Sequence, residues 1–232
     1  MTPQKVNRKA LLGRSLPLVL IWLFVARALV AGSAVSVGVR TGAAASLVLS
    51  SYSQFVQTDL LGQGAGAVTP YPCFSFQVDA YGRVLLGSFL ALETGLSVCQ
   101  VGGGFMASGA TEELVGISVT ELAFPLVVVL LLRTGIGTFG LSLGAMAAIP
   151  LEAPVLVAKT NLASTQTTLT PASSFTGLVA GVSLQREAGP GSLSFDLRYI
   201  YRLQSIVTKL PAEQGSVAPV TLEASVGYLF TF

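Results

Sequence analysis

Apolar and small or polar residues alternate along the last part of the chain. From Leu222 to Phe232 every second residue is apolar, and most residues between them are small or polar. A period of two predicts a β-strand with one apolar and one polar face. Because a tilted strand of about 9–11 residues crosses a bilayer, residues 221–232 have the length and pattern of a membrane-spanning strand.

The same alternation predicts seven further strands. It is clearest in residues 191–205, where charged side chains share one face and aromatic side chains the other. An apolar stripe facing lipid and a polar interior explain both faces, whereas a strand of a soluble sandwich rarely separates charges and aromatics in this way. The other predicted strands are residues 34–49, 73–84, 89–100, 113–132, 139–149 and 174–186.

The links between the predicted strands are alternately short and long. Short links at residues 85–88, 133–138 and 187–190 are rich in turn-forming residues. Long links lie near residues 50–71, 101–112, 151–172 and 206–218. Short periplasmic turns and long extracellular loops are typical of outer-membrane barrels. An even number of strands then places both chain ends on the periplasmic side.

The beginning of the chain has the pattern of an export signal. Lys5, Arg8, Lys9 and Arg14 precede an apolar core at residues 16–26, and small residues follow at 31–34. We therefore predict a cleavable signal peptide at residues 1–32, extending to 34 with a later cleavage site, and one barrel domain at residues 33–232. Arg27 is atypical of such signals, and a retained membrane anchor is the alternative.

The composition fits a membrane protein and excludes several functions. Hydrophobic residues make up 52% of the chain and charged residues 10%, and the mean hydropathy is +0.72. A helical membrane protein is the alternative, but the longest apolar runs, 16–26 and 122–132, are shorter than the roughly 18 residues a helix needs to span a bilayer. The net charge of +2 shows no nucleic-acid footprint. With no histidine and two cysteines, we expect no metal, no cofactor and no enzymatic activity.

The central stretch ELAFPLVVVLLLRTGIGTFGLSLGAMAAIPLE resembles the central hairpin of small porin-like barrels, which include the OmpA transmembrane-like and OmpW-like groups. FSFQVDAYGR, FLALETGLSV and SLSFDLRYIYRL fit the same pattern. The resemblance implies an all-β protein, an eight-stranded antiparallel transmembrane β-barrel in the bacterial outer membrane, in contact with its lipids and with loops at the cell surface. Barrels this small are mostly monomers, and we expect a monomer here.

Aromatic residues at the end of the chain carry a second implication of this resemblance. Tyr228, Phe230 and Phe232 occupy alternate positions, and the chain stops on phenylalanine. In the outer-membrane barrel family this pattern addresses the chain to the barrel-assembly machinery. The expected partners are therefore that machinery and the periplasmic chaperones that deliver unfolded barrels to it.

Eleven side chains are expected to line the interior of the barrel. They are Arg40, Asp79, Arg83, Glu93, Glu121, Val127, Val129, Asp196, Arg198, Arg202 and Glu223. The five acids nearly balance the four arginines, which predicts an ion-pair network that either stiffens a closed barrel or lines a narrow path. The apolar inner face of residues 113–132 is unusual for a water-filled pore. With the OmpW-like resemblance it favours a channel for small hydrophobic solutes. The alternative is a non-conducting barrel whose loops bind host or envelope molecules, as an adhesin or surface antigen.

Pro125 and the two cysteines allow more local predictions. Pro125 cannot donate to a strand ladder, so it is expected to mark a bulge or a gap that favours lateral release of a ligand. With a turn at residues 85–88, Asp79 faces Glu93 and Cys73 faces Cys99. An exported protein permits disulfides, so this register predicts a Cys73–Cys99 bond, with two free thiols as the alternative.

Overall fold

A computed structural model describes residues 34–48, 68–107, 113–159, 164–208 and 217–232. The predicted signal peptide at residues 1–32, and the membrane anchor that is its alternative, lie outside the described residues. So do most of the first long link and parts of the others. Within the described ranges, no helix is long and apolar enough to cross a membrane.

Among the described residues, eleven strands form one sheet. In chain order they are β1 (Val35–Val48), β2 (Val68–Tyr71), β3 (Cys73–Leu85), β4 (Leu90–Ala107), β5 (Glu113–Thr134), β6 (Gly137–Pro150), β7 (Val155–Lys159), β8 (Ser164–Thr168), β9 (Phe175–Ala188), β10 (Gly191–Arg202) and β11 (Pro219–Thr231). Eight of them correspond to the predicted strands, and the other three, β2, β7 and β8, lie within stretches that were predicted as long links.

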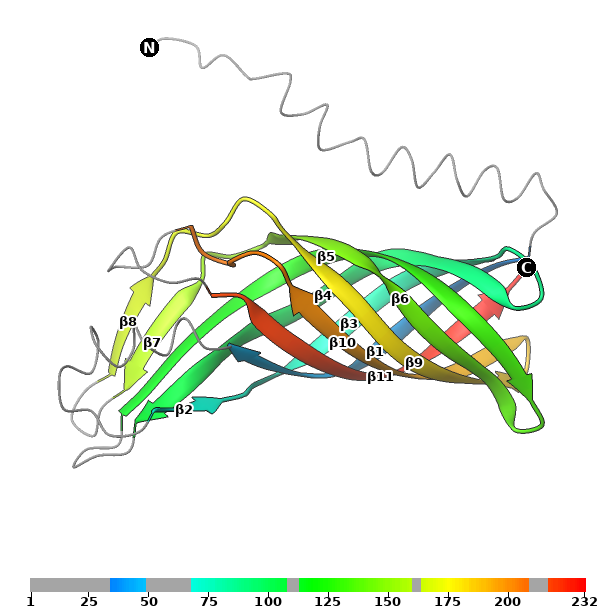
Figure 1. Ribbon diagram of the computed structural model, residues 1–232, viewed down its shortest axis with the longest axis horizontal. Coiled ribbons are helices and arrows are strands. Elements are labelled where there is room, and N and C mark those ends of the chain that lie inside the picture. Colours follow the sequence, from blue (N-terminus) through cyan, green and yellow to red (C-terminus); the bar gives the residue numbers. More distant parts are fainter. Residues whose placement is uncertain (1–33, 49–67, 108–112, 160–163, 209–216) are drawn as a thin grey trace, which may run out of the picture.

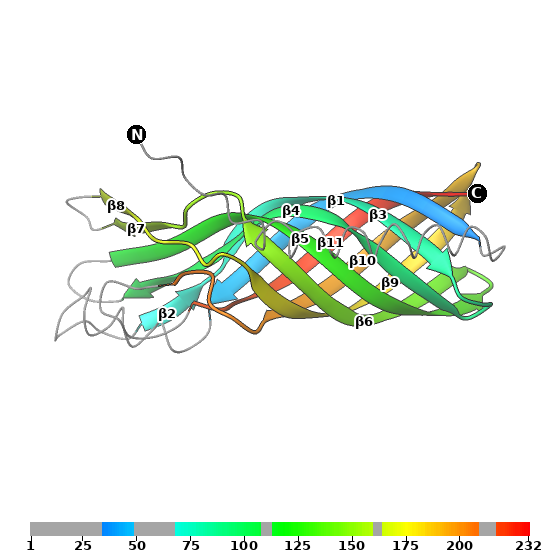
Figure 2. The same ribbon diagram turned by 90° about the horizontal axis from the view of Figure 1, so that it is seen from above.

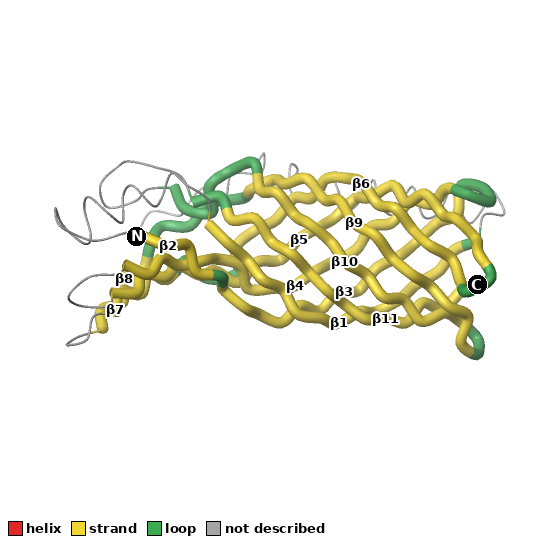
Figure 3. Tube along the Cα trace, turned by 60° about the horizontal axis from the view of Figure 1, so that its bottom comes forward, coloured by secondary structure: helices red, strands yellow, loops and turns green. Residues whose placement is uncertain are grey.

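The sheet closes into a barrel because β4 pairs with both β3 and β5. The ring runs β4-β3-β1-β11-β10-β9-β6-β5 and back to β4, and every pairing in it is antiparallel. These eight strands are tilted against the barrel axis and cross one another front to back in the tube view (Figure 3). The predicted all-β fold, a closed eight-stranded antiparallel barrel, is confirmed.

The two ends of the barrel differ as the link lengths predict. The short turns and the carboxyl terminus gather at one end, on the right in Figure 1. The turn between β9 and β10 contains Gly189, whose φ of +62° lies in the left-handed region that glycine adopts without strain. The opposite end, on the left in Figures 1 and 2, carries β2, β7 and β8.

At this second end the sheet continues past the ring of eight strands. β4 runs to Ala107, beyond its predicted end at Gln100, and pairs there with β2. The outer part of β5 pairs with β7, and β7 pairs with β8. We call β2, β7, β8 and the outer parts of β4 and β5 (residues 104–107 and 113–118) the projecting sheet. Its two edge strands are β2 and β8.

Side chains alternate between a buried interior and an exposed outer face along the barrel strands. In β10, for example, every second residue from Ser194 to Arg202 is buried and those between are exposed. The exposed positions are mainly large and apolar on all eight strands, and we call them the outer apolar band. It includes Val39, Phe76, Val98, Val128, Leu143, Val182, Phe195 and Val226.

The register of the β3–β4 hairpin differs from the predicted one. Leu85 pairs with Ala91, and the Leu86 amide donates to the Leu90 carbonyl at 2.8 Å. The turn therefore lies further along the chain than residues 85–88, and Asp79 faces Ser97 rather than Glu93.

The shifted register separates the two cysteines. Cys99 pairs with Gln77 of β3, and Cys73 pairs with Ser46 of β1. Both thiols are free. The predicted Cys73–Cys99 disulfide is therefore wrong, because it depended on a turn placed too early in the chain.

Pro125 leaves a gap in the ladder but no bulge. The β4–β5 pairs Thr94–Leu126 and Ser97–Ala123 keep one register, and the two pairs between them are missing. The Thr94 hydroxyl donates to the Pro125 carbonyl at 3.0 Å. This side-chain bond joins the two strands beside the missing ladder pairs, so the local gap is bridged.

Candidate functional site

All eleven side chains expected to line the interior are buried, and none is more than 6% exposed. They come from six strands of the ring: Arg40 from β1, Asp79 and Arg83 from β3, Glu93 from β4, Glu121, Val127 and Val129 from β5, Asp196, Arg198 and Arg202 from β10, and Glu223 from β11. The charged positions are concentrated on β1, β3, β10 and β11, whereas the β5, β6 and β9 side of the interior is mostly apolar.

Glu93 is the hub of the larger ion-pair network. Its carboxylate accepts hydrogen bonds from Arg40 at 2.9 Å, from Arg83 at 2.7 Å and from Arg198. Arg40 also donates to Asp79 and lies 3.9 Å from Asp196. Charges removed from water are tolerated only when they are paired and hydrogen-bonded, and this network brings three guanidinium groups onto one carboxylate.

A second ion pair lies further toward the projecting sheet. Arg202 donates to both oxygens of Glu121, at 2.5 and 3.3 Å. It also donates to the Thr221 hydroxyl at 2.7 Å, which in turn donates to Ser46 at 3.2 Å. The two-point contact fixes the guanidinium plane, so this group links β5, β10, β11 and β1 across the interior.

Several interior polar side chains were not singled out from the sequence. Gln77 donates to Asp79 at 2.8 Å, and the Tyr81 and Ser194 hydroxyls lie 3.3 Å apart. The Arg40 guanidinium stacks over the Tyr81 ring, 4.3 Å from its centre. Gln77 and Tyr81 lie two residues before and after Asp79, so the period of two that placed Asp79 inside would have found them as well.

An apolar cluster fills the interior on the β5 side and toward the projecting sheet. Val127 and Val129 belong to it, as the inner face of residues 113–132 predicts. We call its members nearest the long links the apolar plug: Val48, Val101, Phe105, Val119, Phe175, Ile206 and Val217. Val48 ends β1 and Phe175 begins β9, so the plug lies where the strands leave the ring.

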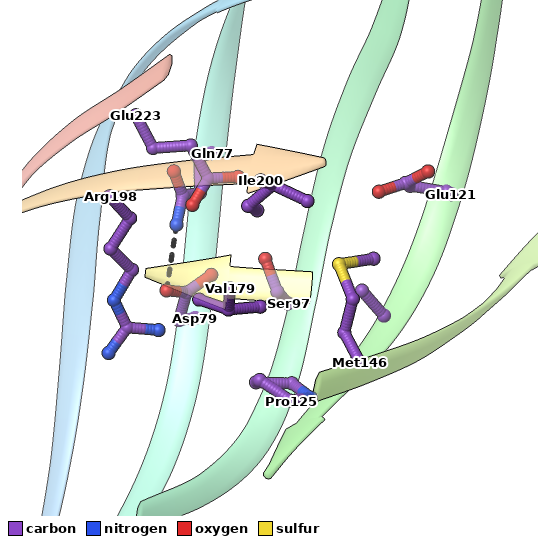
Figure 4. Close-up of a pocket in the computed structure, with 11 residues that line it drawn as sticks. Gln77, Asp79, Ser97, Glu121, Pro125, Met146, Val179, Arg198, Ile200 and Glu223 are labelled. Carbon is purple, nitrogen blue, oxygen red and sulfur yellow. Dashed lines mark hydrogen bonds between the residues drawn. The ribbon is translucent and has the colours of Figure 1, made fainter. Parts of the chain in front are cut away.

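Between the ion pairs and the apolar wall the interior contains a small cavity of ≈ 10 Å³, room for about one water molecule. Figure 4 shows the side chains around it, with a dashed line for the bond from Gln77 to Asp79. Its polar lining comprises Gln77, Asp79, Ser97, Glu121, Arg198 and Glu223, and its apolar lining includes Pro125, Met146, Val179 and Ile200.

The aromatic residues at the end of the chain lie at the seam between β1, β11 and β10. The Tyr228 hydroxyl donates to the Ala188 carbonyl at 2.6 Å, and the Tyr228 and Phe230 rings are 4.6 Å apart, edge to face. The Phe232 amide donates to the Val35 carbonyl at 2.9 Å. These contacts secure the closing strand, while the role of the three residues as an assembly signal stays a prediction.

The part of the chain that the structure describes holds no group of three or more histidine, cysteine, aspartate or glutamate side chains that could bind a metal ion. No protein-family model and no curated protein sequence matches this chain.

Solved structures with a similar arrangement of strands are bacterial barrels. One of them is Ail, the attachment invasion locus protein of Yersinia pestis, solved in complex with the heparin analogue sucrose octasulfate. Its sequence is 18% identical to this chain, and the match covers 85% of this chain and 99% of Ail with a TM-score of 0.39. Neisserial surface protein A is 14% identical to this chain, and the match covers 84% of this chain and 97% of that one with a TM-score of 0.36. The translocator domain of the autotransporter NalP from Neisseria meningitidis is 9% identical, and the match covers 87% of this chain and 89% of that one with a TM-score of 0.35. At these TM-scores the likeness carries no inference, and the barrel is defined by its own strand pairing.

Proposed function

We propose that the protein is a non-conducting barrel of the bacterial outer membrane that displays the projecting sheet at the cell surface. The outer apolar band supports the membrane location, because large apolar side chains are exposed on all eight strands of the ring. Closure of the sheet supports it as well, since the ring of eight strands has no free edge strand whose backbone would need water as a partner.

The packed interior is the observation that carries the non-conducting assignment. The Glu93 network and the Arg202–Glu121 pair cross the middle of the barrel, and the apolar plug fills it toward the projecting sheet. The cavity between them has a volume of ≈ 10 Å³. A solute larger than water would have to displace buried ion pairs, so the packing argues against the hydrophobic-solute channel that the OmpW-like resemblance implied.

The projecting sheet supports a surface-binding role. Its edge strands β2 and β8 each have one ladder partner among the described residues, and edge strands of this kind can pair with another chain. β8 reads Ser-Thr-Gln-Thr-Thr, and its described side chains are exposed. A polar edge resists self-association and still offers hydrogen bonds, which suits contact with host or envelope molecules rather than catalysis.

Conductance and solute uptake test this function. The refolded mature protein, residues 33–232, is inserted in planar bilayers and in vesicles, and the mobility shift between unheated and boiled samples in SDS gels shows that it is folded. We expect no discrete openings and no uptake of small apolar solutes above protein-free vesicles. Openings or uptake that change when Val127 or Arg198 is substituted would establish the channel instead.

A further inference from the structure

The buried charges inside the barrel do not cancel. Among the described residues, the buried carboxylates are Asp79, Glu93, Glu121, Asp196 and Glu223, against the buried guanidinium groups of Arg40, Arg83, Arg198 and Arg202. If all are ionised, the interior carries one surplus negative charge. An uncompensated charge in the interior of a protein is strongly unfavourable.

The surplus falls on Glu223. Within the described part of the chain, the other four acids each lie within 4.0 Å of an arginine, whereas Glu223 forms no such ion pair. Glu223 is 3% exposed, and it lines the small cavity. Arg198, which lines the same cavity, donates its hydrogen bond to Glu93.

Two oxygen atoms at this cavity have no hydrogen-bond partner among the described residues. They are Oε1 of Gln77 and Oδ1 of Asp79, and both side chains are almost completely buried. Gln77 and Asp79 are held in place by the bond from Gln77 Nε2 to Asp79 Oδ2. The Ser97 hydroxyl lines the cavity beside them (Figure 4). The unpaired atoms here are all acceptors.

Three occupants of the cavity differ in whether they balance the surplus charge and whether they satisfy the two unpaired acceptors. A water molecule fits the cavity and satisfies the two acceptors, but it leaves the surplus charge. A proton on Glu223 removes the charge, but Gln77 and Asp79 then need a water molecule as well, so two occupants are required. A small monovalent cation fits the volume, takes carboxylate, amide and hydroxyl oxygens as ligands, as hard cations prefer, and cancels the charge. A divalent ion would leave one positive charge in excess.

We propose that the cavity binds one sodium ion through Asp79, Glu223, Gln77 and Ser97. The site would then be part of the folded interior and stabilise the barrel, because an ion that binds only the folded state shifts the unfolding equilibrium. This inference does not depend on the proposed surface role.

Unfolding in two salts tests the proposal. The mature protein is refolded in vesicles in sodium chloride or in choline chloride at equal concentration and pH, and its unfolding by urea is followed by circular dichroism. At a sodium concentration of about ten times the dissociation constant, we expect the unfolding equilibrium constant to be about tenfold lower in sodium than in choline. Glu223→Gln removes the surplus charge and should abolish the difference. Glu187→Gln, at an exposed carboxylate near a short turn, should keep it.

If Glu223→Gln does not fold, Ser97→Ala removes a neutral ligand and should reduce the sodium effect. Equal stability of the wild type in the two salts would overturn the proposal. Stability that depends on pH identically in both salts would overturn it as well, and would assign the balancing charge to a proton on Glu223.

Discussion

Glu93→Ala is expected to lower the free energy of unfolding by about 3–5 kcal/mol, a typical cost of removing one partner from a buried ion pair. Glu93 accepts hydrogen bonds from Arg40, Arg83 and Arg198. Without its carboxylate, Arg83 and Arg198 lose the only ion-pair partner they have among the described residues. This makes Glu93 the interior position with the largest expected effect.

Urea unfolding of the barrel in vesicles measures this effect, with the mobility shift between unheated and boiled samples as a second readout. Glu187→Ala is the matched control, because it removes an exposed carboxylate from the neighbourhood of a short turn and should change stability little. A Glu93→Ala barrel as stable as the wild type would mean that the network is not formed as described.

Leu143→Arg is expected to destabilise the barrel in vesicles by about 2–4 kcal/mol, the cost of arginine on the lipid face near the bilayer midplane. Leu143 lies in the middle of β6 and is 68% exposed on the outer apolar band. In water, a residue this exposed would tolerate arginine, so the expected loss depends on lipid surrounding this face.

Ile136→Arg is a closely matched control for this substitution. Ile136 is 67% exposed, but it lies in the turn between β5 and β6 at the end of the barrel. We expect arginine there to cost little, since it reaches the water interface. Equal effects at the two positions would contradict the assignment of the outer apolar band to the membrane interior.

The strands and their facing could be predicted from the sequence because both depend on a local period of two. Asp196 and Arg198 point inward and Phe195 and Leu197 outward, as their alternation indicates. The same alternation was enough to predict that Glu93 and Glu121 lie in the interior. The partners they would bind there depend on the stagger between strands, which no single strand encodes.

The register between β3 and β4 was predicted wrongly, because the sequence of each strand does not determine it. The hairpin between β3 and β4 turns at Leu86–Leu90 rather than at 85–88, and this displacement separates Cys73 from Cys99. Turn position depends on which apolar residues the rest of the barrel buries. Ile206 and Val217 of the apolar plug lie outside the barrel strands. Because they are not part of an alternating pattern, the sequence did not predict that they would fill the interior.

The state of the interior could not be predicted from residue types alone. An eight-stranded barrel is just wide enough for its own side chains or one small ligand. Whether it is open therefore depends on their packed volumes. Arginine and glutamate extend across the middle of this barrel, and Phe105 and Phe175 fill its outer part. The same residues that suggested a lined path fill the interior, and this packing supports the proposed non-conducting barrel.

Cysteine labelling in intact cells tests whether the barrel spans the outer membrane with the projecting sheet outside. In a full-length chain with Cys73→Ser and Cys99→Ala, one cysteine is introduced as Ser164→Cys in β8 or as Ile136→Cys in the β5–β6 turn. A membrane-impermeant maleimide should label the β8 position in intact Gram-negative cells, and the turn position only after the outer membrane is opened. Labelling of the turn but not of β8, or equal labelling of both in intact cells, would mean that the barrel does not span the outer membrane with the projecting sheet outside.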